Sequence, residues 1–394
     1  MSQSVASSST EVLPPLYARW VDELLRQPLP LETLATCHDC VMCKPPGPAR
    51  PAPGPQFKPS LKCCTYLPTL PNFLVGAVLA DSSPDAAEGR ATMERRVAAG
   101  VAVTPAGVTM TPVYKLLYQG GKLSGFGRAT ALKCPHYIDR EGGQCGIWRH
   151  RNSVCSTYFC TWERGVVGQR FWQEMVALLQ SVEFSLGDWC VQQLDVGTEA
   201  LQLMFPPPDA KRPSSLSAHD LDGLADAELQ RAVWGRWYGR EREFYVEAAR
   251  LVAPLAWADV ARLGGPGVSI HAQLLGAAYT ALMSDEVPEY LQVSPFDAAP
   301  IDEAFTRVWS RAGRHSPIEV PTPLVSALRH FDGRTRTQDA IFSVVFETRT
   351  GLQKWLVRRL VDCGILSAAG TGASGIGASG EGAAAEAGVA PLMG

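Results

Sequence analysis

A chain of 394 residues is long enough to form two or three domains around a sizeable hydrophobic core. Its 36 Lys and Arg residues nearly balance its 39 Asp and Glu residues, and the net charge is -3. No overall basic field therefore attracts nucleic acid or anionic lipid, and we expect neither as a partner.

The N-terminal residues lack the basic and apolar segments of a secretory signal. The longest apolar stretch, residues 73–80, is much shorter than the roughly 20 residues needed to cross a bilayer. These features predict a cytoplasmic protein without a membrane partner. In a reducing compartment, clustered cysteines are more often metal ligands or redox thiols than disulfides.

The first half of the chain predicts helices joined by irregular segments. The Ser-rich residues 1–13 are expected to be disordered, and residues 14–204 to form a cysteine-rich domain. Apolar spacing predicts helices over residues 16–25, 70–79, 85–99 and 167–182, and a strand or hairpin within 101–111. The Pro-rich segment between Cys43 and Cys63 predicts a loop.

The second half predicts a linker at 205–219 and a helical domain at 220–314, with helices over 225–251, 270–283 and 302–312. A small helical or winged-helix-like domain at 315–366 follows, with Thr322 as an N-cap and Thr335 with Gln338 as a capping box. A Gly- and Ala-rich tail at 367–394 is expected to be disordered. The fold class expected is mainly α with minor β.

Nine of the eleven cysteines lie in one third of the chain: Cys37, Cys40, Cys43, Cys63, Cys64, Cys134, Cys145, Cys155 and Cys160. Thiolates are soft ligands that select zinc, copper(I) or iron–sulfur clusters. The run Cys37-x-x-Cys40-x-x-Cys43 is typical of 4Fe-4S sites, where a Cys-Pro dipeptide often completes the ligand set, as Cys134-Pro135 could. Adjacent residues of an extended strand point in opposite directions, so Cys63 and Cys64 favour two neighbouring sites.

These nine residues are therefore our candidate ligands for one or two iron–sulfur clusters of the 4Fe-4S type. The alternative is one or two closed zinc sites that only stabilise the fold, although zinc ribbons usually carry paired CxxC motifs. A further alternative is free or disulfide-forming thiols. His38, His136 and His150 lie among the cysteines, and we expect them around the ligands rather than as ligands.

Two stretches resemble known families. Residues 37–165 resemble the YkgJ-type "CxxCxxCC" proteins, which are described as zinc- or iron-chelating. The likeness rests on Cys134-Pro-His-Tyr, Gly143-Gln-Cys145-Gly-Ile-Trp148, Arg151 and Cys155-Ser-Thr-Tyr-Phe-Cys160, although Asn152 replaces the usual Pro. The resemblance implies a metal centre and leaves the activity open. Residues 322–366 weakly resemble PqqD-like or winged-helix domains, which implies peptide binding.

The sequence therefore predicts an iron–sulfur protein with an electron-transfer or redox-enzyme role, acting with a redox partner. The alternative is a zinc-stabilised module that binds a peptide or protein without catalysis. A third hypothesis is an enzyme whose open metal position binds substrate. If the chain is an enzyme, we expect an iron–sulfur oxidoreductase. Residues 234–245 interleave Arg with aromatic residues, which we interpret as helix packing, and no nucleotide-binding or serine-hydrolase motif is present.

Overall fold

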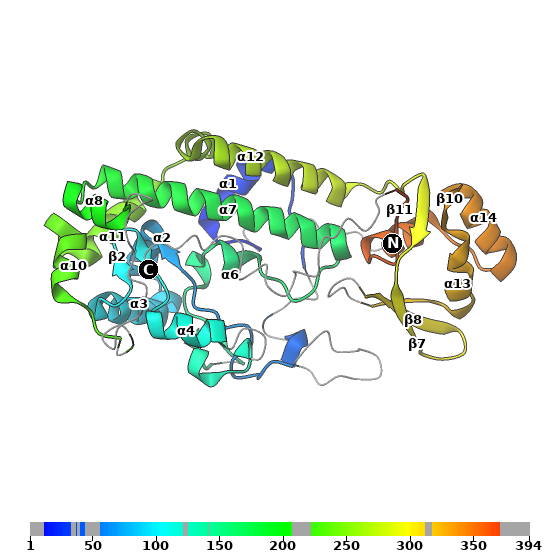
Figure 1. The fold of residues 1–394 in the computed structure, drawn as a ribbon, viewed down its shortest axis with the longest axis horizontal. Helices are drawn as coiled ribbons and strands as arrows, with labels where there is room; N and C mark the ends of the chain where they lie inside the picture. Colours follow the sequence, from blue (N-terminus) through cyan, green and yellow to red (C-terminus); the bar gives the residue numbers. More distant parts are fainter. Residues whose placement is uncertain are drawn as a thin grey trace.

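The computed structural model describes residues 12–32, 37, 40–43, 56–120, 125–140, 142–206, 221, 223–311 and 317–370. Within them the chain is mainly helical with short strands, which confirms the predicted fold class. Two lobes lie side by side in Figure 1. Buried apolar residues form one core in each, from residues 13–282 in the larger lobe and 291–366 in the smaller one.

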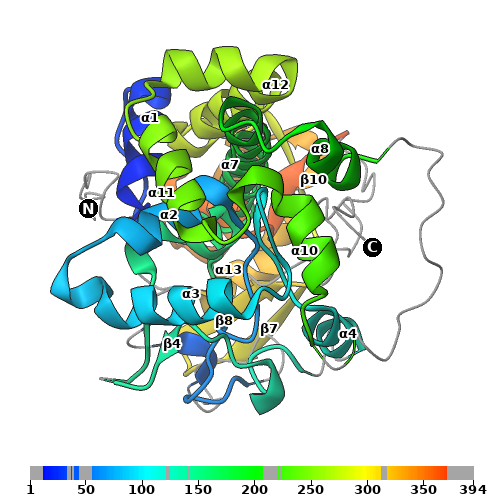
Figure 2. The same cartoon turned by 90° about the vertical axis from the view of Figure 1, so that its left-hand side faces the viewer.

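Two long helices run in opposite directions along the larger lobe, α7 (Gly165–Gln193) and α12 (Trp257–Met283). Figure 2 shows α1 (Pro15–Leu25) beside them. The Trp20 indole N–H donates to the Leu255 carbonyl at 2.8 Å and fixes α1 against the start of α12. The helices predicted at 16–25, 167–182 and 270–283 are confirmed, and the last two extend further than expected.

Helix α2 (Asn72–Ala80) crosses α11 (Glu241–Val252) at very close range. A Cβ at Gly76 would lie 1.7 Å from the Tyr245 carbonyl oxygen, so only glycine permits this crossing. The Asn72 side-chain amide donates to Pro105 at 2.9 Å and to Gly187 at 2.8 Å, which ties α2 to α7. The buried helix predicted at 70–79 is confirmed.

The helix predicted over 225–251 is wrong as one element, because it breaks into α10 (Ala227–Trp234) and α11. Gly235 (φ +50°) and Gly239 (φ +77°) adopt left-handed backbone conformations between the two helices. Trp234 is buried and packs edge-to-face on Phe244 at 5.5 Å. Residues 234–245 thus pack as the sequence predicted.

Shorter elements complete the larger lobe: η2 (Val41–Cys43), β1 (Leu70–Pro71), η3 (Pro84–Ala86), α3 (Ala87–Ala99), β2 (Val103–Thr104), β3 (Gly107–Val108), α4 (Pro112–Gly120), η4 (Thr130–Leu132), β4 (Tyr137–Ile138), β5 (Gln144–Cys145), η5 (Trp148–His150), α6 (Ser153–Thr157), α8 (Thr198–Met204) and η6 (Gly235–Trp237). Strands β2 and β3 form the hairpin predicted within 101–111. None of the described helices is long and apolar enough to span a bilayer.

As far as it is described, the smaller lobe contains two three-stranded antiparallel sheets and three α-helices. One sheet has the order β10 (Asp332–Arg336), β6 (Tyr290–Val293) and β11 (Leu366–Ala368). The other has the order β7 (Phe296–Pro300), β8 (Phe305–Ser310) and β9 (Ile318–Pro321). The helices are α13 (Thr322–Ala327), α14 (Thr337–Thr348) and α15 (Lys354–Asp362), and η7 (Leu328–His330) follows α13.

Three expectations for this region are wrong. Residues 302–311, the described part of the helix predicted at 302–312, form no helix, because β8 pairs with a strand on each side. The predicted helical domain at 220–314 is divided, since α10 to α12 share the larger core and β6 to β8 belong to the smaller lobe. Strand β11 continues to Ala368, past the expected start of the disordered tail at 367. Residues 1–11, 207–220 and 371–394, where disorder and a linker were predicted, lie outside the described residues.

The predicted caps also differ from the structure. Helix α13 begins at Thr322 itself, and α14 begins at Thr337, whose hydroxyl donates to the Pro288 carbonyl at 2.7 Å. Thr335 therefore precedes the helix, inside β10, and makes no capping box with Gln338.

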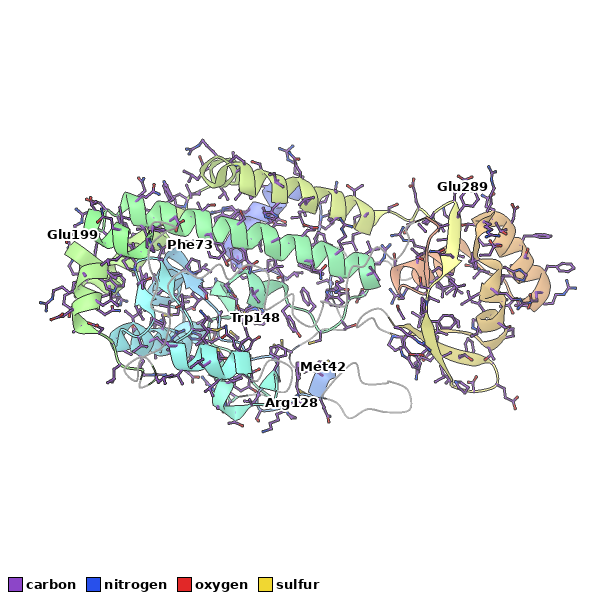
Figure 3. The ribbon with its side chains drawn as sticks, in the orientation of Figure 1. Met42, Phe73, Arg128, Trp148, Glu199 and Glu289 are labelled. Atoms are coloured by element: carbon purple, nitrogen blue, oxygen red, sulfur yellow. The ribbon has the colours of Figure 1, made fainter. Side chains whose placement is uncertain are left out.

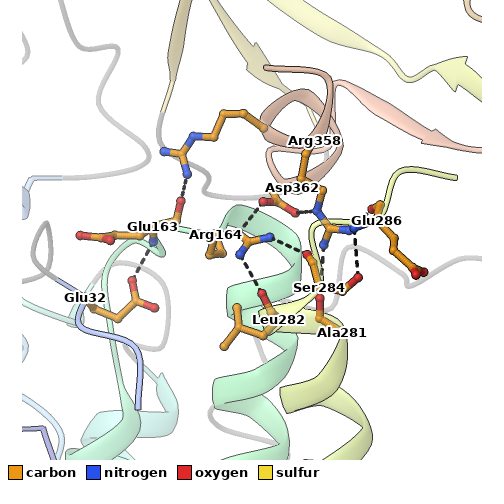
Figure 4. A network of polar contacts seen from close by, with 10 residues as sticks. Glu32, Glu163, Arg164, Ala281, Leu282, Ser284, Glu286, Arg358 and Asp362 are labelled. Atoms are coloured by element: carbon orange, nitrogen blue, oxygen red, sulfur yellow. Dashed lines mark hydrogen bonds and ion pairs between the residues drawn. The ribbon is translucent and has the colours of Figure 1, made fainter. Parts of the chain in front are cut away.

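A polar network joins the two lobes (Figure 4). The Arg164 guanidinium, just before α7, donates to the Asp362 carboxylate at 2.6 Å and to the Leu282 carbonyl at 2.7 Å. Arg358 donates to the other Asp362 oxygen at 2.9 Å. Gly165 has φ +53°, and a Cβ there would lie 1.9 Å from the Asp362 carbonyl oxygen. The start of α7 and the end of α15 are therefore in direct contact.

Candidate metal centre

The nine clustered cysteines, which we call the cysteine site, lie on turns and short elements of the larger lobe. Met42, Arg128 and Trp148, which neighbour them in sequence or space, lie on the side of α7 away from α12 (Figure 3). Cys43 ends η2, Cys145 lies in β5, and Cys155 lies in α6. All eleven cysteines are free thiols. The cysteine-rich region is irregular, as predicted.

Backbone hydrogen bonds join segments of the site that are far apart in sequence. The Cys134 amide donates to the Cys64 carbonyl at 2.8 Å. Cys145 pairs with Tyr137 in the β4–β5 hairpin, and the Gly146 amide donates to the His136 carbonyl at 2.8 Å. The Cys-Cys pair, Cys134 and Cys145 are thus brought together by the backbone.

Lys62 connects three more parts of the site. Its ammonium donates to the Cys37 carbonyl at 2.6 Å and to the Gly143 carbonyl at 3.2 Å, and Cys63 follows it in the chain. Lys62 is only 6% exposed, and its backbone adopts a left-handed conformation with φ +53°. Such a conformation is uncommon for a residue with a side chain, so the surrounding contacts hold it.

Several thiols hydrogen-bond one another. A hydrogen bond from Cys160 lowers the pKa of Cys40 to about 6, and the same contact raises the pKa of Cys160. The Cys63 thiol hydrogen-bonds Cys64, and this contact, with burial, raises the pKa of Cys63. Cys63 and Cys64 therefore do not point apart as an extended strand would require, because they lie in a turn.

Backbone amides also hydrogen-bond cysteine sulfurs, and the Cys43 amide donates to Cys40. Three more amides share a common spacing. They belong to Met42, His136 and Ile147, each two residues after its cysteine, namely Cys40, Cys134 and Cys145. Each hydrogen bond lowers the pKa of its cysteine, because an amide N–H stabilises a thiolate more than a thiol. Burial is the larger effect at Cys134 and Cys145, and it raises the pKa of both.

Electrostatic interactions divide the cysteines into groups. Burial and then the charges of Cys145 and Cys134 raise the pKa of Cys155, so these three are neighbours. Burial and then Cys40 raise the pKa of Cys43, and Cys40 hydrogen-bonds Cys160. The charge of Cys63 raises the pKa of Cys43 in one group and of Cys155 in the other. Cys134 therefore lies near Cys145 and Cys155 in the metal-free chain.

Within the described ranges, no three His, Cys, Asp or Glu side chains are arranged as the ligands of one ion. The sulfurs are grouped and hydrogen-bonded, but they do not surround a common point. Ligation of a metal would require these thiol contacts to be exchanged for metal–sulfur bonds.

Two buried carboxylates hold the cysteine segments against α7. Glu183 accepts hydrogen bonds from the Tyr17 hydroxyl, from the Ser153 amide at 2.6 Å and from the Ser153 hydroxyl at 2.8 Å. Ser153 begins α6, which carries Cys155. Burial raises the pKa of Glu183 to about 7. Glu183 thereby fixes the position of α6.

Glu32 has the same role for another segment. It accepts hydrogen bonds from the Glu163 amide at 2.7 Å and from the Trp172 indole at 2.8 Å. Glu163 is three residues after Cys160, and burial raises the pKa of Glu32 to about 7. Sequence reasoning missed Lys62, Glu32 and Glu183, because single charged residues carry no pattern that reveals a buried partner.

The histidines are placed beside the cysteine site. The Thr92 hydroxyl donates to the Gly89 carbonyl at 2.6 Å, so the His136 Nδ1–H must donate to Thr92, at 2.7 Å. Burial and then Arg96 lower the pKa of His136 to about 3, which keeps the ring neutral. His150 Nε2 pairs with Asp81 at 2.8 Å, and His38 lies outside the described residues.

The other two cysteines lie outside the cysteine site. Cys190 is buried within α7, with its sulfur 3.8 Å from the Ala248 carbonyl oxygen, and burial raises its pKa to about 12. Cys363 is buried directly after α15 in the smaller lobe. These two residues therefore serve as internal controls for the site.

In comparisons with known proteins, no family model, no curated protein and no solved structure matches this chain.

Proposed function

We propose that this chain is an iron–sulfur protein that binds one or two clusters, of the 4Fe-4S type, through the nine cysteines, with a role in electron transfer or redox catalysis in the cytoplasm. One observation carries the proposal. Cysteines from widely separated segments, Cys37–Cys43, Cys63–Cys64, Cys134–Cys145 and Cys155–Cys160, lie close together in the larger lobe. A structural core has no need for nine thiols in one place.

The chemistry of the donor set fits such a cluster. Thiolates are the usual protein ligands of iron–sulfur clusters, and amide hydrogen bonds to their sulfurs tune the reduction potential. The amides of Met42, His136 and Ile147 supply hydrogen bonds of this kind. The resemblance of residues 37–165 to YkgJ-type proteins supports the same proposal.

Two groups of sulfurs would share the ligation. Cys40, Cys43 and Cys160 form one group, and Cys134, Cys145 and Cys155 form the other, with Cys63 between them. A bound cluster would supply a centre that takes up and releases one electron at a time. The chain's own residues would orient the thiolates and exclude water, and Glu32 and Glu183 would hold two of the ligand segments against α7.

A second candidate is a zinc-stabilised module that binds a peptide or protein without catalysis. The same thiolates would hold zinc in closed sites. Phe342 and Phe346 of α14 favour this candidate, since they are 73% and 63% exposed and stack on each other at 6.4 Å. Large exposed aromatic side chains often mark contact surfaces. The resemblance of residues 322–366 to PqqD-like domains points the same way.

Metal analysis separates the two candidates. The full chain is purified without oxygen, and its iron, acid-labile sulfide and zinc are measured with its visible spectrum. Brown protein with matched iron and sulfide supports the iron–sulfur proposal. Colourless protein with stoichiometric zinc supports the zinc module, and a fully folded protein without either metal would refute both.

Single substitutions then test the ligands. Cys155→Ser and Cys160→Ser should each lose most of the bound metal and destabilise the larger lobe, because metal binding contributes to folding free energy. Cys190→Ser and Cys363→Ser remove buried thiols that lie outside the cysteine site, and they should keep wild-type metal content. Equal metal loss in both pairs would contradict the assignment of the cysteine site.

A further inference from the structure

Two cations are buried inside the cysteine site. The Lys62 ammonium is bonded by two carbonyl oxygens, those of Cys37 and Gly143. In the part of the chain that the structure describes, no carboxylate forms an ion pair with it. The two carbonyls accept from two of its three N–H groups, and neither carries a negative charge that would balance the ammonium.

Arg151 is placed in the same way. It is 9% exposed, and its guanidinium donates to the Cys155 carbonyl at 3.0 Å and to the Trp148 carbonyl at 3.2 Å. The guanidinium carbon lies 3.4 Å from the centre of the Trp148 ring. Among the described residues no carboxylate pairs with Arg151 either, so a second buried positive charge lies at the site.

A buried charge without a counter-charge is costly, commonly by several kcal/mol, so these two cations need a negative partner. Among the residues that the structure places, the acidic groups around them are thiols of the cysteine site. Burial raises the pKa of Cys37, and the charges of Arg151 and Lys62 oppose that rise. Arg151 opposes the effect of burial at Cys145 in the same way.

We propose that Lys62 and Arg151 are the internal counter-charges of the metal centre and that they strengthen metal binding by offsetting the charge of the ligating thiolates. This inference rests on the proposed function. Four thiolates around one divalent ion leave two negative charges in excess, and two buried cations neutralise them. With protonated thiols the same cations have no compensating charge, so their charge favours the metal-loaded form over the metal-free form.

Metal affinity distinguishes this role from simple packing. A residue that only packs stabilises the metal-free and metal-loaded forms alike, and its replacement leaves the affinity unchanged. A counter-charge stabilises only the loaded form. Replacing it therefore weakens metal binding, by about 10- to 100-fold if the effect is that of other groups surrounding metal ligands.

The test uses the full chain, stripped of metal by a chelator under reducing, oxygen-free conditions. The affinity for Zn²⁺ alone is measured by competition with a chromophoric chelator. Lys62→Gln keeps a hydrogen-bond donor but removes the charge, and it should bind Zn²⁺ at least 10-fold more weakly. Lys62→Arg keeps the charge and should retain affinity. The matched control is Lys58→Gln, which removes an exposed charge from the same turn and should have no effect.

Arg151→Gln tests the second cation independently, so the proposal remains testable if one variant fails to fold. Its matched control is Arg149→Gln, which removes an exposed charge from the adjoining turn. Wild-type affinity in both Lys62→Gln and Arg151→Gln would overturn the counter-charge proposal while leaving the metal site intact. Failure of the wild-type chain to bind Zn²⁺ would instead overturn the proposed metal centre itself.

Discussion

Replacing the buried carboxylate of Glu183 should change the pH dependence of folding. Glu183 is 7% exposed, and burial raises its pKa from 4.5 to about 7. Between these pH values the folded protein holds a proton that the unfolded chain has released. The free energy of unfolding therefore falls as the pH rises from about 4.5 to about 7, and Glu183 has no further effect above that range.

The size of this effect follows from the shift in pKa. One unit corresponds to about 1.4 kcal/mol, so Glu183 should cost about 3 kcal/mol of stability above pH 7. In Glu183→Gln, the amide oxygen can accept from the Tyr17 hydroxyl and the Ser153 amide, as one carboxylate oxygen does now. The amide nitrogen can donate to the Ser153 hydroxyl. The variant thus keeps three hydrogen bonds and removes the charge.

We expect Glu183→Gln to match the wild type near pH 4.5 and to be more stable by up to about 3 kcal/mol at pH 8.5. Urea unfolding of metal-free, reduced protein at a series of pH values measures this difference. Glu32 titrates in the same pH range, but it is present in both proteins. Its contribution therefore cancels in the difference between their free energies of unfolding. Tyr17 stays protonated, because burial and Glu183 raise its pKa well above 10.

Glu183→Ala provides the opposite control. It leaves the Tyr17 hydroxyl and the Ser153 amide buried without a partner, each at a cost of about 1–3 kcal/mol, so it should be destabilised at every pH. Parallel stability curves for the wild type and Glu183→Gln would refute the reasoning, because they would mean that Glu183 does not titrate differently on folding.

The contact between the lobes gives two further predictions. Gly165→Ala should lower the melting temperature by several degrees, since φ is +53° and the new Cβ would clash with the Asp362 carbonyl, whereas Gly276→Ala, with open space around it, should not. Asp362→Ala should lower the free energy of unfolding by about 3 kcal/mol in urea, because it leaves Arg164 and Arg358 without their carboxylate. Unchanged unfolding in Asp362→Ala would mean that the network contributes nothing to stability.

The helical faces could be read from the sequence because their apolar spacing is local. Phe171, Met175, Leu178 and Val182 repeat at helical intervals, and all four are buried along α7. The break in the helix predicted at 225–251 was also visible in principle, since Gly235 and Gly239 are both present in the chain. Strand β8 could not be predicted from local apolar spacing, because its stability comes from pairing with β7 and β9.

The cysteines of the candidate site were identifiable from residue type and spacing alone, whereas the residues that hold them in place were not. The role of Glu32 depends on contacts with Glu163 and Trp172, more than 130 residues away. The sequence around Lys62 likewise gives no sign of its role. Only its buried contacts with the Cys37 and Gly143 carbonyls distinguish it from other lysines.

The short stretch from Cys160 to Arg164 belongs to the cysteine site at one end and to the network between the lobes at the other. Glu163, between them, is held from one side by Glu32 and from the other by Arg359. Hydrogen bonds therefore restrain the backbone of this stretch between its two ends. If the cysteine site takes up an ion as proposed, a movement of Cys160 would therefore reach the Asp362 network that joins the two lobes.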